Sequence, residues 1–315
     1  MAGSFGSRTS DVQLDDARFE DLFERVITPA LAPHEVERQR LVKRFWLAVK
    51  LGVVIAACVV VPLTMATGDS DTIYLGFLIV LGAAGLVYVP LATFEKRCKA
   101  KALNALAEAI GMTYQCEGFT PPRLGHLGEF GLVEAWDESR WEDLFSGSRG
   151  GVPFQLYETT LTTGSGKNTR TVFSGQVIRI DFPKTFLGTT VINRDSVRRW
   201  RFGAPKLEKV RLESSQFERI FEVHGTDQVE ARYLVHPAFM ERLMALETAS
   251  AGRNLRCVFD DGDLIIAIEG ANLFEVVEVF KPLPSREQTR KGVRQIAEVL
   301  GLIDAVMAPP PRAYG

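Results

Sequence analysis

Two long apolar stretches stand out in the first third of the chain. Residues 45–66 read FWLAVKLGVVIAACVVVPLTMA, with Lys50 as the one charged residue, and residues 73–94 read IYLGFLIVLGAAGLVYVPLATF, with none. A helix of roughly 20 apolar residues crosses the hydrocarbon core of a bilayer. Each stretch is therefore predicted to be a transmembrane helix. Lys50 lies one turn inside the first, where its long side chain can reach back to the interface.

Basic residues flank this pair of stretches on the outer sides only. The short connection, residues 67–72, holds no Lys or Arg, whereas the outer flanks hold Arg38, Arg40, Lys43, Arg44, Lys96, Arg97, Lys99 and Lys101. Basic flanks stay in the cytoplasm. We predict a helical hairpin (residues 41–101) in a membrane, with the lipid bilayer as a partner and both termini cytoplasmic. Small residues such as Gly52 and Gly82 allow close helix approach, either within one chain or in self-association.

An amphipathic helix is predicted in the N-terminal tail, residues 1–40. Apolar residues recur there at helical spacing, at Phe19, Leu22, Phe23, Val26 and Ile27. The sequence TPALAP at 28–33 should interrupt this helix, and a second one should run into the first span. The polar side is acidic, which disfavours anionic lipid. We expect the apolar face to dock on the chain's own cytoplasmic domain.

The pattern changes to short β-type segments after residue 111. Alternating or β-branched runs occupy residues 152–162, 170–182, 187–193, 207–212, 221–224, 257–259 and 264–268. Turn sequences at 163–168 and 260–263 predict hairpins. Helical spacing returns near 230–248 and at 285–307. We predict an α+β cytoplasmic domain over 102–308, with a mainly antiparallel sheet and flanking helices, followed by a proline-rich tail at 309–315.

Composition narrows the functional classes. The net charge of −2 gives no general argument for nucleic acid, and the four cysteines and four histidines are scattered. Neither a disulfide framework nor a metal site is predicted, and no cofactor. The stretch GSGKN at 164–168 lacks the first glycine and the Ser/Thr of a phosphate loop, and a strand follows it. The DDGD sequence at 260–263 could attract a cation, but a plain turn is the favoured interpretation.

Two charged clusters are candidate functional sites, and each also has a purely structural interpretation. A basic stretch, residues 194–211, includes the candidate lipid-headgroup residues Arg198, Arg199, Arg201 and Lys206. A solvated face, anionic headgroups and nucleic acid are the alternatives in decreasing order. Acidic residues gather around two tryptophans at Glu134, Asp137, Glu138, Glu142 and Asp143. Carboxylates can act as acid and base, but a surface helix or loop capped by acids is preferred.

The densest mixture of polar and apolar residues is DQVEARYLVHPAFMERL at 227–243. Asp227 and Glu230 fit a helix cap, and Pro237 should begin a second helix. Val229, Tyr233 and Leu234 are expected to form an apolar face. Arg232 and His236 have no evident structural part, although a buried ion pair with a Glu would explain Arg232. The candidate ligand- or partner-binding residues are Asp227, Glu230, Arg232, Tyr233 and His236.

This motif resembles an uncharacterised bacterial membrane-protein family catalogued as a domain of unknown function. The segments TDQVEARYL (226–234) and PAFMERL (237–243) carry the resemblance, together with EDLFSG (142–147), VFSG (172–175) and LFE (273–275). The resemblance spans about residues 40 to 285. It implies a two-span anchor in a bacterial inner membrane with a cytoplasmic domain and no assigned activity. His236 stands where threonine is common in the family, which weakens a catalytic role.

Three functional hypotheses follow from these patterns. The first is a membrane-anchored cytoplasmic adaptor that binds a protein partner or the leaflet surface. The second is a membrane-tethered ligand sensor or enzyme with a pocket near residues 227–236. The third is a structural membrane element that oligomerises through its spans. The adaptor is preferred, and enzymatic activity is disfavoured, because no catalytic constellation accompanies the domain.

Overall fold

The computed structural model describes residues 16–67, 72–123, 125–182, 185–194, 206–249, 254–270, 274 and 276–307. The chain divides into two compact units. We call Glu20–Leu106 with Glu275–Arg290 the helical unit, and Met1–Phe19, Ala107–Phe274 and Lys291–Gly315 the sheet unit. The helical unit thus includes a late segment that lies about 170 residues from its other part along the sequence.

The N-terminal helices change their winding before the first long helix. The order is α1 (Asp16–Leu22), a π-helical turn (Phe23–Ile27), α2 (Thr28–Leu31), a 3-10 turn (Ala32–His34), α3 (Glu35–Thr67) and α4 (Thr72–Ala109). The prolines at 29 and 33 occupy the first positions of their helical turns, where a missing N–H is tolerated. The predicted interruption is therefore a change of winding and not a break.

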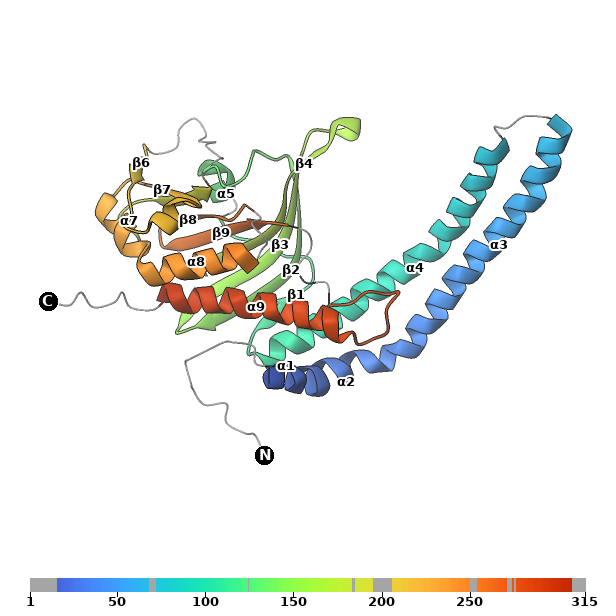
Figure 1. Ribbon diagram of the computed structural model, residues 1–315, viewed down its shortest axis with the longest axis horizontal. Helices are drawn as coiled ribbons and strands as arrows, with labels where there is room; N and C mark the ends of the chain where they lie inside the picture. Colours follow the sequence, from blue (N-terminus) through green and yellow to red (C-terminus); the bar gives the residue numbers. More distant parts are fainter. Residues whose placement is uncertain are drawn as a thin grey trace. The chain divides into compact units, whose positions relative to one another are not determined.

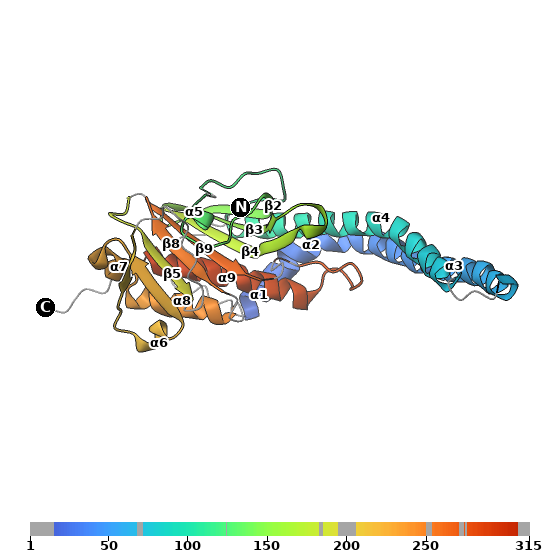
Figure 2. The ribbon, with the colours of Figure 1, turned by 90° about the horizontal axis from the view of Figure 1, so that it is seen from above.

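The helices α3 and α4 are long and apolar enough to cross a membrane. They lie side by side in both views (Figures 1 and 2). Only 11% of the most apolar window of each helix is buried. A Cβ added to Gly52 would lie 3.0 Å from the Ala83 Cβ, whereas one added to Gly82 would meet nothing within 4 Å. Gly52 therefore serves packing within the pair, and Gly82 does not.

The amphipathic face of the N-terminal helices is buried against the chain itself, as expected. Phe19, Phe23, Ile27 and Leu31, spaced every four residues, are each at most 4% exposed. Within the helical unit, Arg286 lies over the Phe23 ring, 4.7 Å from its centroid, and pairs with Glu20 and Glu24. The start of α9 is thus one part of the chain that holds this segment.

A single antiparallel sheet forms the centre of the sheet unit, in the part of the chain that the structure describes. Its order is β1-β2-β3-β4-β9-β8-β5-β7-β6. The bounds are β1 Thr113–Gln115, β2 Glu138–Arg149, β3 Val152–Thr163, β4 Arg170–Asp181, β5 Thr190–Arg194, β6 Glu208–Val210, β7 Phe221–Gly225, β8 Arg256–Asp260 and β9 Asp263–Glu269. The predicted α+β class, the mainly antiparallel sheet and both predicted hairpins are confirmed.

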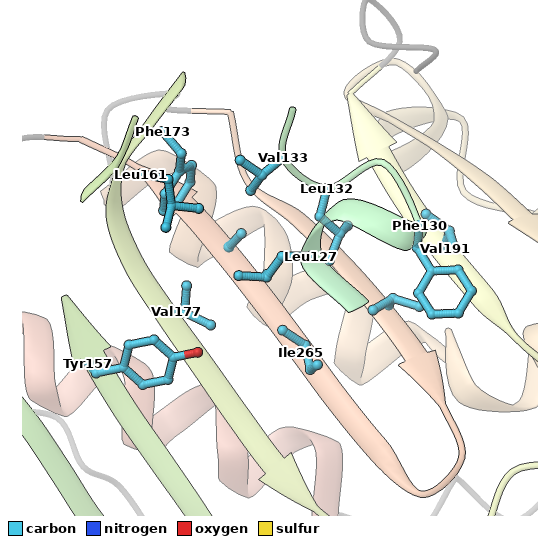
Figure 3. Close-up of a cluster of buried hydrophobic side chains, with 12 residues drawn as sticks. Leu127, Phe130, Leu132, Val133, Tyr157, Leu161, Phe173, Val177, Val191 and Ile265 are labelled. Atoms are coloured by element: carbon cyan, nitrogen blue, oxygen red, sulfur yellow. The ribbon is translucent and has the colours of Figure 1, made fainter. Parts of the chain in front are cut away.

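Helices and a short turn complete the unit. They are α5 (Gly125–Glu129), a 3-10 turn (Gly166–Asn168), α6 (Ser215–Glu218), α7 (Gln228–Leu234), α8 (Pro237–Ala249) and α9 (Arg286–Met307). Figure 1 shows α8 and the later part of α9 lying across the strands. Ile265 of β9 points with Leu127 and Phe130 into a core cluster beside α5 (Figure 3), and Ala267 belongs to the same cluster. Strand β9 is buried along most of its length because both of its faces are covered.

One sequence expectation about this unit is wrong. The acidic segment around Trp141 was expected to be a surface helix or loop, but residues 138–149 form β2 and pair with β3. A bulge lies between Glu142 and Phe145, and Asp143 within it has a φ of 55°. Acidic, Ser and Gly residues are poor strand formers, so only the pairing with β3 and the burial of Phe145 make this segment a strand.

Candidate functional site

The helix pair α7–α8 begins with a tight N-terminal cap. Asp227 has an extended backbone, and its Oδ1 accepts hydrogen bonds of 2.8 Å from the N–H groups of Val229 and Glu230. These are N–H groups that the first turn of a helix leaves without partners. Pro237 begins α8, as predicted. The Asp227 carboxylate is therefore engaged in local structure.

Glu230 holds a loop from elsewhere in the chain. Its two carboxylate oxygens accept from the backbone N–H groups of Leu187 and Gly188 at 2.7 and 2.8 Å. A Cβ at Gly188 would lie 2.1 Å from the Thr226 Oγ1, which leaves room for glycine alone. The Thr226 hydroxyl oxygen in turn accepts from the Thr189 N–H at 2.9 Å. The end of β7, the start of α7 and the entry to β5 thus form one hydrogen-bonded corner.

Arg232 is exposed and bonds to neutral oxygens. It donates to the Gln228 carbonyl at 3.2 Å, to the Gln228 side-chain oxygen at 3.1 Å and to the Arg211 carbonyl at 3.3 Å. Among the described residues no carboxylate pairs with it, so the buried Arg232–Glu ion pair considered from the sequence is not present. Its positive charge remains on the surface.

The apolar face expected for α7 points to solvent. Val229 is 77% exposed and Tyr233 is 61% exposed, whereas Ala231 and Val235 are fully buried. Leu187, whose N–H is bound by Glu230, is 87% exposed beside the helix. The cap at Asp227 and the Glu230 contacts fix the rotation of this two-turn helix, and they turn Val229 and Tyr233 outward.

His236 lies buried at the start of α8. Its Nδ1 accepts from the Phe239 N–H at 3.4 Å, and its carbonyl accepts from the Met240 N–H at 3.0 Å. Burial lowers the pKa of His236. A neutral ring can offer Nδ1 as an acceptor, so the side chain caps α8. His236 is close in sequence to the exposed residues of α7, but its side chain is buried.

The arrangement favours recognition over acid–base chemistry. Asp227 and Glu230 already accept backbone hydrogen bonds, and His236 is buried as a cap. The accessible groups are Leu187, Val229, Arg232 and Tyr233, which we call the α7 face. Apolar side chains next to a cation suit the binding of another macromolecule.

The acidic residues of the β2 region have structural partners. Asp137 Oδ2 accepts from the Gly164 N–H at 2.8 Å and the Thr163 hydroxyl at 2.9 Å, and these bonds lower the pKa of Asp137. Asp143 accepts from the Tyr114 hydroxyl at 2.5 Å, and burial raises the pKa of Tyr114. Glu134 pairs with Arg170, and Glu142 with Arg140.

An ionic cluster at the β8–β9 turn escaped the sequence reasoning. Asp263 is 2% exposed, and its two oxygens lie 2.8 Å from Arg123 Nε and 2.8 Å from Arg179 Nη2. Arg123 also reaches Asp261 at 2.9 Å. Burial raises the pKa of Asp263, while the two arginines oppose that shift. The DDGD sequence showed only the acids, because the arginines come from distant parts of the chain.

Much of the basic stretch lies outside the residues that the structure describes. Arg198, Arg199 and Arg201 fall outside the described residues, and Lys206 is exposed. Arg194 Nε lies 3.3 Å from Glu247, and Lys209 lies 2.7 Å from Glu222. Within the described ranges, no group of three or more His, Cys, Asp or Glu side chains is placed to hold a metal ion.

Comparison with known structures gave one match. It is the crystal structure of the mycobacterial trehalose monomycolate transport factor A, TtfA, with a TM-score of 0.39 and 12% sequence identity. The likeness covers 69% of this chain and 99% of that chain. No curated protein matches the sequence.

A family model covers the second half of the chain. Its description is "Protein of unknown function (DUF3137)", and it matches residues 171–307, from β4 to the end of α9. The match starts later and ends later than the expected 40 to 285, so the long helices and β1–β3 lie outside it. The motif at 227–243 lies inside. Residues 171–307 are therefore similar to this family of unknown function, as the resemblance of the motif indicated.

Proposed function

We propose that this chain is a membrane-anchored adaptor whose sheet unit presents the α7 face to another protein. The anchor is the pair α3–α4, whose surfaces carry exposed Leu, Val and Phe side chains along their apolar lengths. Such surfaces suit lipid. The basic flanks argue for cytoplasmic ends of both helices.

The observation that carries the proposal is the exposure of Leu187, Val229 and Tyr233 on a corner whose backbone is held by hydrogen bonds. Single exposed apolar residues are ordinary on protein surfaces, whereas a cluster on a fixed element is typical of an interaction site. Tyr and Arg are the residue types that most often dominate binding energy. A preorganised surface also loses little entropy on binding.

The charge of the face indicates the chemistry of the partner. Arg232 and Arg211 are exposed and adjacent, since the Arg211 carbonyl accepts from Arg232, and neither is paired with a carboxylate among the described residues. The acids Asp227 and Glu230 are engaged by backbone N–H groups. The partner is therefore an acidic protein segment that carries apolar side chains to meet Val229 and Tyr233.

The test is photocrosslinking in intact cells. Tyr233 is replaced by p-benzoylphenylalanine, which keeps an aromatic ring at the site, and Lys167 in the exposed β3–β4 turn is replaced in the control. We expect a discrete protein adduct from position 233, absent from position 167 and lost when Arg232→Glu is added. Carbonate extraction of the same cells should leave the chain in the membrane pellet.

Three outcomes would contradict the proposal. Identical adducts from positions 233 and 167 would show that the α7 face has no particular partner. Release of the chain by carbonate would remove the anchor. Stabilisation of the wild type by a metabolite in a thermal-shift screen, lost in Arg232→Ala and without a protein adduct, would make this corner a ligand site.

A further inference from the structure

In the helical unit, the connection between β9 and α9 is held against the start of α3 and the later half of α4. Val279 donates its N–H to Glu95 Oε1 at 3.1 Å, and its carbonyl accepts from Arg38 Nη1 at 3.0 Å. Leu283 donates its N–H to Glu35 Oε2 at 2.9 Å. Side chains of α3 and α4 therefore bind the backbone of residues 279–283 at three points.

These contacts are made by charged groups that stay charged. Arg38 is only 7% exposed and donates two hydrogen bonds to Glu35, at 2.7 and 2.8 Å. The Arg38 guanidinium lowers the pKa of Glu35 to about 2, helped by the Leu283 N–H. Glu35 is therefore ionised at neutral pH. Charge-assisted hydrogen bonds of this kind are stronger than neutral ones, so the segment has a defined position.

Phe280 is exposed, whereas the valines and the leucine of this segment are buried. Val276, Val277, Val279 and Leu283 are each at most 6% exposed, whereas Phe280 is 46% exposed. Its ring lies edge-on to Phe45, with centroids 5.6 Å apart. The fixed backbone on either side prevents the ring from withdrawing into the unit.

The neighbours of Phe280 lie where the apolar stretch of α3 begins. Phe45 is the first residue of the apolar stretch and directly follows Arg44, the last basic residue before it. Its ring also contacts Trp46, which is 52% exposed. Trp is one of the two residue types that gather where a membrane-spanning helix meets the headgroup region, and Trp46 directly follows Phe45. Phe45 and Trp46 occupy that boundary on α3, and Phe280 extends it from a segment over 230 residues later in the chain.

We infer that Phe280, together with Phe45 and Trp46, inserts into the headgroup–acyl boundary of the bilayer, which makes the β9–α9 connection a lipid-binding segment. This inference rests on the proposed anchoring by α3 and α4. The occupant is the lipid interface, because the exposed ring is continuous with the first residues of the apolar stretch and Lys281, 47% exposed in its side chain, follows it where anionic headgroups would lie.

The experiment measures depth in the bilayer. The full chain, with Cys58→Ala and Cys116→Ala, receives one cysteine at Phe280, Val36 or Val54 and is labelled with an environment-sensitive fluorophore. Cys98 and Cys257 are buried and should not react. Val36 and Val54 are exposed residues of α3, each nine residues from Phe45, or about 14 Å along the helix. They serve as markers for water and for the hydrocarbon core.

The protein is reconstituted into phosphatidylcholine–phosphatidylglycerol vesicles that contain lipids with a spin-label quencher at a shallow or a deep position. We expect blue-shifted emission at position 280 and stronger quenching by the shallow label than by the deep one. Position 54 should be quenched more by the deep label, and position 36 by neither. If Phe280→Cys fails to accumulate, Lys281→Cys replaces it.

The controls distinguish the anchoring by α3 and α4 from the lipid-binding segment. If position 54 is not quenched by the deep label, the anchoring itself is wrong. If position 54 is quenched but position 280 behaves like position 36, the anchor stands and the lipid-binding segment is refuted. A blue shift at position 280 without quenching by either lipid would show that protein, such as a second copy of the chain, covers Phe280, and would also overturn the inference.

Discussion

The long helices and the sheet unit use the same residue types in opposite ways. On α4, Leu86 is 82% exposed and Phe77 is 65% exposed, whereas Phe259 and Ile266 of the sheet unit are at most 1% exposed. The first arrangement suits a surrounding of lipid, and the second suits a surrounding of water. The chain's average of 46% hydrophobic residues hides this division, because it combines exposed apolar side chains on the long helices with buried ones in the sheet unit.

The two regions also differ in how they are held together. Apart from the ionic cluster of Asp263 with Arg123 and Arg179, the sheet unit relies on apolar contacts. Examples are those among Phe186, Phe239 and Phe259, whose neighbouring ring centroids lie 5.4 to 5.6 Å apart. The helical unit secures its late segment with the buried Arg38 and its partner Glu35. Apolar packing is only slightly sensitive to pH, whereas an ionic contact can be broken by protonation. Mutations and acid should therefore affect the two regions differently.

The largest effect is expected from Phe259→Ala. Truncating a buried aromatic side chain costs about 3–5 kcal/mol through lost burial and the cavity that remains. Phe77→Ala on α4, where the ring is exposed, should change stability by less than about 0.5 kcal/mol. Denaturant melts of the purified full chain in detergent would measure both. Equal losses for the two variants would show that the contrast between the regions is false.

Arg38→Met tests the ionic contact of the helical unit. Removing one partner of a buried ion pair costs about 3 kcal/mol, since Glu35 keeps its charge without its main partner. The matched control is Arg97→Met, because Arg97 is 61% exposed and its pair with Glu37 is worth at most about 1 kcal/mol. Limited proteolysis should cut residues 276–285 faster in Arg38→Met alone. Equal cleavage in both variants would mean that Arg38 does not hold this segment.

Acid should weaken the contact between Arg38 and Glu35 over a defined pH range. The pKa of Glu35 is about 2 in the folded chain against 4.5 ordinarily. A lowered folded pKa gives a stabilisation that is complete above about 4.5 and disappears as the pH falls toward about 2. The protection of residues 276–285 from an acid-active protease should fall over that interval. Glu35→Gln should show weaker protection and less pH dependence, and an unchanged profile would contradict this role.

The helix cap at the candidate site should have a smaller effect. Asp227→Ala removes the acceptor for two backbone N–H groups and should cost about 1 kcal/mol. Asp227→Ser retains a capping oxygen and should recover most of the loss. Thermal melts would compare the three proteins. If Asp227→Ala were as stable as the wild type, Asp227 would not be held by its capping bonds and would be available to a ligand.

Tyr233→Ala should have the smallest effect on stability. The side chain is 61% exposed, and such substitutions usually change the free energy of unfolding by less than about 0.5 kcal/mol. The same variant should nevertheless weaken recovery of the crosslinked partner from a photoreactive residue placed at Val229. A large loss of stability would show that Tyr233 packs within the fold and does not serve binding.

The sequence anticipated local features well and distant ones poorly. The cap at Asp227, the start of α8 at Pro237 and the β8–β9 turn follow from short patterns, and each is present. Strand β2 was missed because its partner β3 supplies the stabilisation. Helical spacing placed Val229 and Tyr233 on one side of α7, but it does not show which side of a helix faces the core.

The sequence by itself determined how residue types are distributed along the chain. These features are two apolar stretches, the basic residues that flank them, and alternating segments that require a sheet. These depend on neighbouring residues, since burial in lipid or in a core acts on each helix or strand as a whole. Tertiary structure alone decided which groups meet: Arg123 with Asp263, Glu230 with Leu187, and Arg38 with Val279. Such contacts join residues between about 40 and 240 positions apart, and their geometry exists only once the chain has folded.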